Sequence, residues 1–355
     1  MAKLTEEQFN RITEKNKPLG LVPIDSVDTD ALGLEDYDVI EDYGYGGHTL
    51  KNFYRVNSSI FQSVFDEIKN NPECSFVTPY NDIVKEGIIP EKVSVLIKDT
   101  PHHLEERIAC QLLNYYGVAC PVNIGVVGGE LFQDNVKSLP NNKKSARFRD
   151  MTSGLLGFYS YSVSMDFMSE GDTLETFAGE DENVRFFTSR CDSIDRVRSK
   201  ITEVLNSEKF EKLGKVAKQK LATQLEDEFI MSMLVRRVIC CDSDFNTNNV
   251  GILTGKTPRI MNFDFELSLG KYTNKGTSLT LLKDVKIHYP KVYEKFLSKT
   301  SALCENVGNA DEKLVRKTLR NPQLYVPLFD NLEFVMNCEK ENFNVKKLLA
   351  NKPNM

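Results

Sequence analysis

The first half of the chain alternates between the hydrophobic period of strands and that of helices. Residues 93–98, Val-Ser-Val-Leu-Ile-Lys, alternate and are rich in β-branched side chains, which predicts a strand. Apolar residues then recur at helical spacing from Leu104 to Leu113, and Gly117 follows them, so a helix is predicted that ends at this glycine. Two further strands are expected, over 122–127 and 155–165.

The sequence before the first of these strands has a mixed pattern. Residues 1–35 are expected to form an N-terminal helix that is followed by a loop around Pro18 and Pro23. A second helix is expected over 58–70.

Beyond an acidic, turn-rich stretch at 169–184, the hydrophobic period becomes helical. Helices are predicted over 192–206, 208–222, 222–240 and within 280–350, and short strands over 250–253 and 259–263. A β-rich first half and a helical second half predict an α+β fold with two lobes. The first domain, residues 1–168, is expected to hold an N-terminal extension and a β-rich lobe, and the second, 169–355, a helical lobe.

Length, composition and charge limit the functional classes. The 355 residues include 45 basic and 51 acidic side chains, a net charge of −6, which argues against a protein that coats nucleic acid or a membrane surface. No stretch approaches the ~20 apolar residues of a membrane span. The N-terminus lacks the apolar segment of a signal peptide. We therefore expect a cytoplasmic protein without direct nucleic-acid binding.

The segment with the most chemical information is 240–266. An apolar helix is predicted to end in a polar loop, Asp-Ser-Asp-Phe-Asn-Thr-Asn-Asn, and a hairpin follows that ends on Asp264 between Phe263 and Phe265. An ionised carboxylate among apolar neighbours is costly unless a cation pairs with it. A carboxylate and an asparagine at one hairpin mouth would suit Mg²⁺. An ordinary turn, for which Asp and Asn are the commonest residues, is the alternative.

The spacing in this segment favours the chemical interpretation. Asp244 and Asn249 form an Asp-x-x-x-x-Asn pattern, and the hairpin that ends on Asp264 follows. Protein kinases carry their catalytic-loop aspartate, metal-binding asparagine and DFG-type aspartate in this order. Asp244 is therefore the candidate for the catalytic base, and Asn249 and Asp264 are the candidate ligands of Mg²⁺. Asp242 competes with Asp244, but its spacing to Asn249 disfavours it.

A kinase also needs a lysine and a glutamate upstream of the catalytic loop. Lys98 ends the predicted strand 93–98, the place of the lysine in the kinase V-A-I-K strand. Glu106 lies early in the next helix, where it could hold the ammonium of Lys98 against a phosphate. Glu105 is the alternative partner. Taken singly, a lysine at a strand end and a glutamate on a helix are usually solvated surface residues.

A glycine cluster is the candidate for the loop that covers the phosphates of ATP. Gly44, Gly46 and Gly47 would let backbone N–H groups approach a phosphate. The cluster lies far before Lys98, with the helix predicted at 58–70 between them. A structural turn is therefore the alternative.

These motifs resemble the HipA-like kinases, and within them the CtkA-type branch. Glu106–Val118 looks like the family's E-x-x-A-x-x-L-x-x-x-x-G helix after the lysine strand, and Met165–Met168 is similar to its acid-Phe segment at the lobe junction. The segment from Asp244 to Asp264 resembles the family's D-x-x-x-x-N, strand and F-D. The resemblance extends over 90–270. It implies a bilobal protein-kinase-like fold, ATP with Mg²⁺, and a serine/threonine kinase that phosphorylates a protein substrate and itself.

The sequence departs from the family pattern around the catalytic aspartate. Phe245 and Asn246 follow Asp244 where the family often has His or Arg, Asn248 precedes the metal-binding asparagine, and no glycine follows Phe265. A pseudokinase that serves as a nucleotide-binding interaction module is therefore one alternative. A small-molecule kinase of the aminoglycoside type is another, although the chain lacks the H-G-D-x-x-x-x-N motif that these enzymes usually carry.

Overall fold

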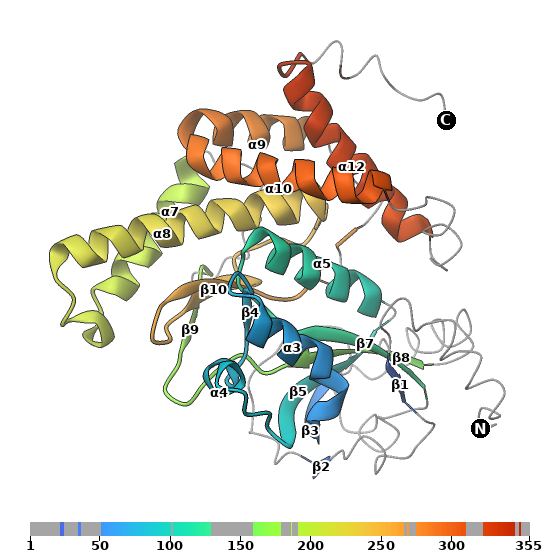
Figure 1. Ribbon diagram of the computed structural model, residues 1–355. Coiled ribbons are helices and arrows are strands. Elements are labelled where there is room, and N and C mark those ends of the chain that lie inside the picture. The colour runs from blue at the N-terminus through green and yellow to red at the C-terminus, as the bar shows by residue number, and fades with distance from the viewer. Residues whose placement is uncertain are drawn as a thin grey trace, which may run out of the picture. The chain divides into compact units, whose positions relative to one another are not determined.

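The computed structural model describes residues 22–24, 35–36, 51–100, 102–128, 159–178, 186, 191–265, 268–269, 275–309, 322–344 and 348. The chain divides into two compact units. The sheet unit comprises Met1–Cys110 and Pro121–Met168, and the helical unit comprises Gln111–Cys120 and Ser169–Met355. A sheet-rich N-terminal region is thus followed by a helical C-terminal region (Figure 1).

A six-stranded sheet forms the centre of the sheet unit. In spatial order its strands are β1 (Val22–Ile24), β7 (Asn123–Gly128), β8 (Tyr159–Met165), β5 (Lys92–Asp99), β3 (Lys51–Asn57) and β2 (Glu35–Asp36). β1 and β7 are parallel, and the other neighbouring pairs are antiparallel. On β5 the side chains of Val93, Val95 and Ile97 are buried on one face, as the alternation in the sequence predicts.

Helices and short elements complete this part of the chain. They are η2 (Ser58–Phe61), α3 (Gln62–Asn70), β4 (Phe76–Val77), α4 (Asn81–Lys85), α5 (His103–Tyr116) and β6 (Cys120–Pro121). The predicted strand at 93–98, the helix after it and the helix at 58–70 are confirmed. β7 and β8 confirm the strand predicted at 122–127 and the described part of the strand predicted at 155–165.

The loop predicted around Pro23 is wrong, because Pro23 lies in β1. β1 is at the edge of the sheet and pairs only with β7 among the described strands. Proline has no N–H to donate, so an edge strand is the place in a sheet where it is tolerated. Most of 1–35, including Pro18 and the predicted N-terminal helix, lies outside the described residues.

The helical unit contains a small antiparallel sheet and a group of helices. The strands, in spatial order, are β11 (Arg259–Asn262), β10 (Val250–Leu253) and β9 (Leu174–Thr176). The helical elements are α7 (Cys191–Leu205), η3 (Glu208–Phe210), α8 (Lys215–Leu234), η4 (Val235–Ile239), α9 (Lys275–His288), α10 (Pro290–Asn309) and α12 (Pro322–Lys340). Figure 1 shows α9, α10 and α12 grouped beside the long α8.

Gln111–Cys120, which follows the first turns of α5, belongs to the helical unit through contacts with α10 and β11. The ring of Tyr116 stacks on Phe296 with centroids 5.4 Å apart, and its hydroxyl is 2.8 Å from that of Thr300. Ala119 accepts a hydrogen bond from the Asn262 N–H at 3.1 Å. This last contact ties the segment to the end of the β10–β11 hairpin.

The hairpin predicted at 250–263 is confirmed as β10 and β11, but another prediction for this half is wrong. One helix, α8, replaces the two that were predicted over 208–222 and 222–240. It begins after Gly214, whose φ of −65° and ψ of 155° are extended, and no Gly or Pro near residue 222 interrupts it. The acidic, turn-rich stretch predicted at 169–184 begins where the chain passes into the helical unit, and it also contains β9.

Among the residues that the structure describes, no helix has both the length and the apolar character needed to cross a bilayer.

A close approach of β9 to β10 generates a stability prediction. A Cβ at Gly251 would lie 2.7 Å from the carbonyl oxygen of Glu175 on β9. Gly251→Ala should therefore separate the strands and lower the free energy of unfolding by about 1–3 kcal/mol, measured by denaturant titration. Gly255→Ala, in the turn after β10, is the control, because its Cβ would have no neighbour closer than 3.5 Å. Equal losses for the two variants would contradict the prediction.

Candidate active site

The segment with the predicted chemistry begins where α8 ends. The helix continues into a π-helix, Val235–Ile239, in which the Cys240 N–H donates to the Val235 carbonyl at 2.8 Å. Cys241 has a φ of 49°, so the chain leaves the helix in the left-handed conformation. Single turns of π-helix occur frequently at functional sites. Here the turn contains two adjacent arginines, both of which bind the loop that follows.

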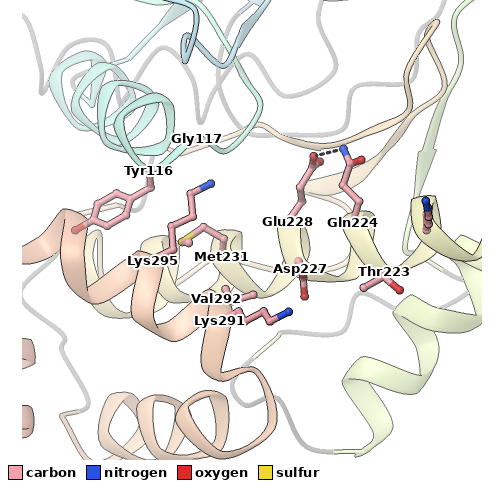
Figure 2. Close-up of a pocket in the computed structure, with 11 residues that line it drawn as sticks. Tyr116, Gly117, Thr223, Gln224, Asp227, Glu228, Met231, Lys291, Val292 and Lys295 are labelled. Atoms are coloured by element: carbon pink, nitrogen blue, oxygen red, sulfur yellow. Dashed lines mark hydrogen bonds between the residues drawn. The ribbon is translucent and has the colours of Figure 1, made fainter.

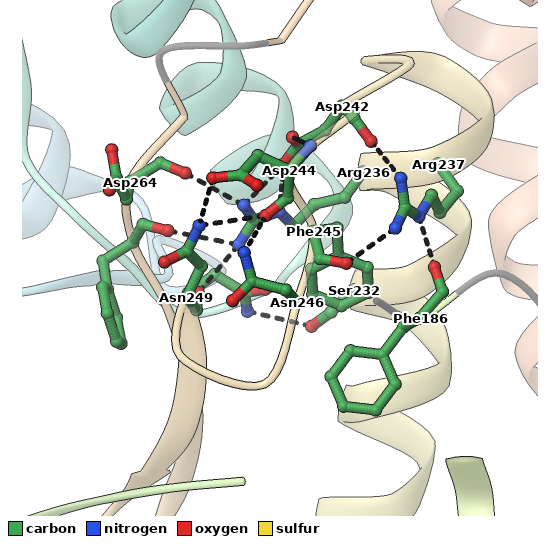
Figure 3. A network of polar contacts seen from close by, with 12 residues as sticks. Phe186, Ser232, Arg236, Arg237, Asp242, Asp244, Phe245, Asn246, Asn249 and Asp264 are labelled. Atoms are coloured by element: carbon green, nitrogen blue, oxygen red, sulfur yellow. Dashed lines mark hydrogen bonds and ion pairs between the residues drawn. The ribbon is translucent and has the colours of Figure 1, made fainter. Parts of the chain in front are cut away.

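The guanidinium of Arg236 is fully buried and binds the loop and the hairpin at once (Figure 3). Its Nε donates to Asp242 Oδ2 at 2.6 Å, and its Nη2 pairs with the same carboxylate oxygen. Nη1 donates to the carbonyl oxygens of Asn249 at 2.8 Å and Phe263 at 3.2 Å, and Nη2 donates to that of Asp264 at 3.0 Å. Four hydrogen bonds and the ion pair with Asp242 thus hold this guanidinium.

Two aromatic rings cover the faces of this guanidinium. The Arg236 Cζ lies 4.6 Å from the ring centroids of both Phe245 and Phe265. Such cation–π contacts are strongest when the cation is withdrawn from water. Phe245 packs in turn against Phe186 and Phe229, with centroids 5.3 and 6.1 Å away. The apolar residue that follows Asp244 is therefore part of the support of the loop.

Arg237 binds the outer side of the same loop. Its guanidinium donates to the carbonyl oxygens of Phe186, Asp242 and Phe245, the last at 2.6 Å from Nη2. The two arginines therefore fix the loop backbone on both sides of Asp244.

Asp244 and Asn249 are brought together by this loop. The Asn249 Nδ2 donates to the Asp244 carbonyl at 2.9 Å and to its Oδ2 at 3.2 Å. The Asp244 N–H donates to Asp242 Oδ1 at 2.8 Å. Both carboxylate oxygens of the buried Asp242 are thus used inside the protein. Asp244, which is half-buried, is the aspartate of the loop that can face a substrate.

Asp264 lies at the same end of the hairpin as Asn249. The register pairs Val250 with Asn262, and the Phe263 N–H donates to the Asn249 carbonyl at 3.2 Å. Figure 3 shows Asp244, Asn249 and Asp264 next to one another there. The premise that the Asp264 carboxylate lies among apolar groups is wrong, because the residue is exposed while Phe265 is buried. The Asp264 φ of 58° interrupts the extended backbone at this point.

The oxygen donors at this position suit a magnesium ion. The Asp264 carboxylate is exposed, and the Asn249 side chain supplies an amide oxygen; both are hard donors. No three His, Cys, Asp or Glu side chains cluster in the described part of the chain. Mg²⁺ commonly takes one or two protein oxygens and completes its shell with phosphate and water, whereas zinc is usually bound by nitrogen and sulfur. The carboxylate and amide oxygens therefore fit Mg²⁺ better than zinc.

Lys98 and Glu106 form a buried ion pair in the sheet unit. The Lys98 Nζ lies 2.8 Å from Glu106 Oε1, and the two residues are 8% and 2% exposed. Glu105, the alternative partner, lies 3.2 Å from the His102 ring through its own Oε1. The structure therefore selects Glu106. Gly44, Gly46 and Gly47 lie outside the described residues.

A cavity of about 480 Å³ lies elsewhere in the helical unit (Figure 2). Its walls come from the end of α5, from α8 and from α10, and Lys291 and Lys295 on α10 face Asp227 and Glu228 on α8. Glu228 binds Arg259 Nε at 2.9 Å and the Ile260 N–H at 3.0 Å. None of the predicted site residues within the described part of the chain lines this cavity, so we locate the candidate active site at the loop and hairpin.

The structure thus brings together Lys98 with Glu106 in one unit and Asp244 with Asn249 and Asp264 in the other. Sequence reasoning missed Arg236 and Arg237. The signal was present, because two consecutive charges interrupt the run 233–241, which is otherwise apolar. Charged residues at such positions are buried only when they are paired.

Comparison with known proteins adds little to this geometry. No protein-family model and no curated protein matches the chain. Among solved structures, the chain is similar to the crystal structure of a Helicobacter pylori proinflammatory kinase, CtkA, with 12% sequence identity and a TM-score of 0.33. The match covers 73% of this chain and 91% of that chain. Conclusions about function therefore rest on the residues themselves.

The buried arginine generates a second stability prediction. Arg236→Met keeps much of the side-chain volume but leaves the Asp242 charge buried without its cation, which should cost about 3–5 kcal/mol of unfolding free energy. Arg198→Met is the matched control: Arg198 binds Glu226 at 2.8 Å, but its side chain is half-exposed, and exposed pairs contribute about 0–1 kcal/mol. Denaturant titration measures both. A loss at Arg236 no larger than that at Arg198 would contradict the prediction.

Proposed function

We propose that this protein is an ATP- and Mg²⁺-dependent phosphotransferase, and that its acceptor is a serine or threonine hydroxyl of a protein, including its own. The observation that carries the proposal is the joint placement of Asp244, Asn249 and Asp264 at one end of the β10–β11 hairpin. The choice of a protein acceptor rests on the resemblance of Glu106–Val118 and Met165–Met168 to HipA-like kinases.

In this proposal Asp244 acts on the acceptor. The acceptor oxygen forms a bond to the γ-phosphorus of ATP, the bond from that phosphorus to the β,γ-bridging oxygen breaks, and ADP leaves. The acceptor proton passes to the Asp244 carboxylate. Asn249 holds that carboxylate through its 3.2 Å hydrogen bond, so the base is oriented before the acceptor arrives. Positioning of this kind supplies most of the acceleration in phosphoryl transfer.

Asn249 and Asp264 would hold the metal ion. Mg²⁺ held there would supply positive charge to neutralise the phosphate oxygens. The role of the protein is to keep the two side chains at a fixed separation, and the Arg236 guanidinium supports this because it binds the backbone carbonyls of both residues. Lys98 would meet the α- and β-phosphates, with Glu106 orienting its ammonium.

Removal of the metal-binding carboxylate should abolish nucleotide binding. We expect Asp264→Ala to bind Mg-ATP too weakly for detection by calorimetry, because the variant loses the charged ligand of the metal. Asp195→Ala, which removes a largely exposed carboxylate on α7, is the control and should bind like the unmodified protein. If Asp264→Ala retained the affinity of the unmodified protein, the metal role of Asp264 would be refuted.

Removal of the base should separate binding from turnover. We expect Asp244→Ala to bind Mg-ATP normally and to transfer the γ-phosphate about 100- to 10,000-fold more slowly. Transfer is measured with γ-labelled ATP and Mg²⁺, on the protein alone and with cell lysate. Undiminished transfer would assign the base to another residue.

Two outcomes would favour the alternatives. Binding of ATP without any transfer by the unmodified protein would favour a nucleotide-binding interaction module. Transfer to an aminoglycoside or an amino alcohol, with no labelled protein, would favour a small-molecule kinase.

A further inference from the structure

A row of polar side chains crosses one face of the six-stranded sheet. In the antiparallel pairing of β5 with β8, Lys98 lies opposite Ser162, and in the pairing of β7 with β8, Asn123 lies opposite Ser164. Residues directly opposite one another project from the same face of a sheet, as do residues two apart on one strand. Lys98, Ser162, Ser164 and Asn123 therefore share a face.

Three members of this row, Lys98, Asn123 and Ser162, bind Glu106. Glu106 Oε1 contacts the Lys98 Nζ, while Oε2 accepts hydrogen bonds from the Asn123 Nδ2 at 3.2 Å and from the Ser162 Oγ. The Asn123 Nδ2 also lies 2.7 Å from the Ser162 Oγ and 2.8 Å from the Ser164 Oγ. Glu106 is 2% exposed, Ser162 0% and Asn123 6%. Side chains from three strands thus bind the Glu106 carboxylate: Lys98 on β5 binds one oxygen, and Asn123 on β7 and Ser162 on β8 bind the other.

We propose that Ser162 and Asn123, here called the Glu106 latch, are positioning residues. They hold the Glu106 carboxylate in place, and Glu106 in turn fixes the Lys98 ammonium for phosphate binding. The nucleotide site is therefore not switched on and off by movement of Glu106. The proposal rests on the function proposed above and concerns the regulation of the same site.

The physical reason is the cost of withdrawing Glu106. If its carboxylate moved away, the buried ion pair between Lys98 and Glu106 would be lost, and Ser162 and Asn123 would each lose a hydrogen bond to a charged acceptor. A buried ion pair that lacks further hydrogen bonds does not repay the loss of hydration. The latch supplies those bonds on the side of the carboxylate that faces away from Lys98.

Two serines on the same strand give a matched test. Ser162→Ala removes a donor to Glu106, whereas Ser164→Ala removes a hydroxyl that contacts Asn123 and has no contact with Glu106 among those described. We expect Ser162→Ala to weaken Mg-ATP binding about tenfold by calorimetry, a loss of the size that one hydrogen bond contributes. Ser164→Ala should bind as the unmodified protein does, with both variants melting at similar temperatures.

A second readout tests the latch without nucleotide. Hydrogen exchange of the α5 amides near Glu106 should be faster in a Ser162→Ala, Asn123→Ala double variant than in Ser164→Ala. If the unmodified protein binds Mg-ATP and Ser162→Ala binds it equally well, the latch has no positioning role and the inference is refuted. If the unmodified protein binds no Mg-ATP, the proposed function fails instead. In that case the hydrogen-exchange measurement still tests the latch. If the α5 amides exchange no faster in the double variant than in Ser164→Ala, the latch is refuted as well.

Discussion

The loop that carries Asp244 and Asn249 depends on one buried cation, the guanidinium of Arg236. It joins the end of α8 to the loop at Asp242 and to the hairpin at Asp264, 28 positions further along the chain. An unbound N–H of a buried guanidinium is costly. The backbone carbonyls around Arg236 are therefore held in the positions where they accept its hydrogen bonds. This constraint gives the loop and the hairpin end a common reference point, and the spacing of the candidate base and metal ligands follows from it.

The same constraint accounts for the unusual backbone on either side of the loop. Cys241 and Asp264 both have positive φ values, 49° and 58°, which a residue with a side chain adopts only where its surroundings require it. Between them, Arg236 and Arg237 bind the carbonyls of Asp242, Phe245 and Asn249. The left-handed residues turn the chain so that these carbonyls face the two cations.

Each of the two units contains a buried ion pair whose carboxylate accepts further hydrogen bonds. Arg236 with Asp242, and Lys98 with Glu106, would each be unfavourable as isolated pairs, because hydration is lost from both charges. In both cases further hydrogen bonds complete the carboxylate: the Asp244 N–H binds Asp242, and Asn123 and Ser162 bind Glu106. What the protein gains is a defined geometry around a charge.

Periodicity and spacing in the sequence determined the local elements, namely β5, α5 and the β10–β11 hairpin, and the order of Asp244, Asn249 and Asp264. These depend on neighbours a few residues apart, which the sequence displays directly. Only the tertiary structure decided that Pro23 lies in an edge strand, that Glu106 rather than Glu105 meets Lys98, and that Asp242 is buried while Asp264 is exposed. It also introduced Arg236, Asn123 and Ser162. Their contacts connect residues up to 56 positions apart, and a local pattern carries no information about which distant groups will share one buried environment.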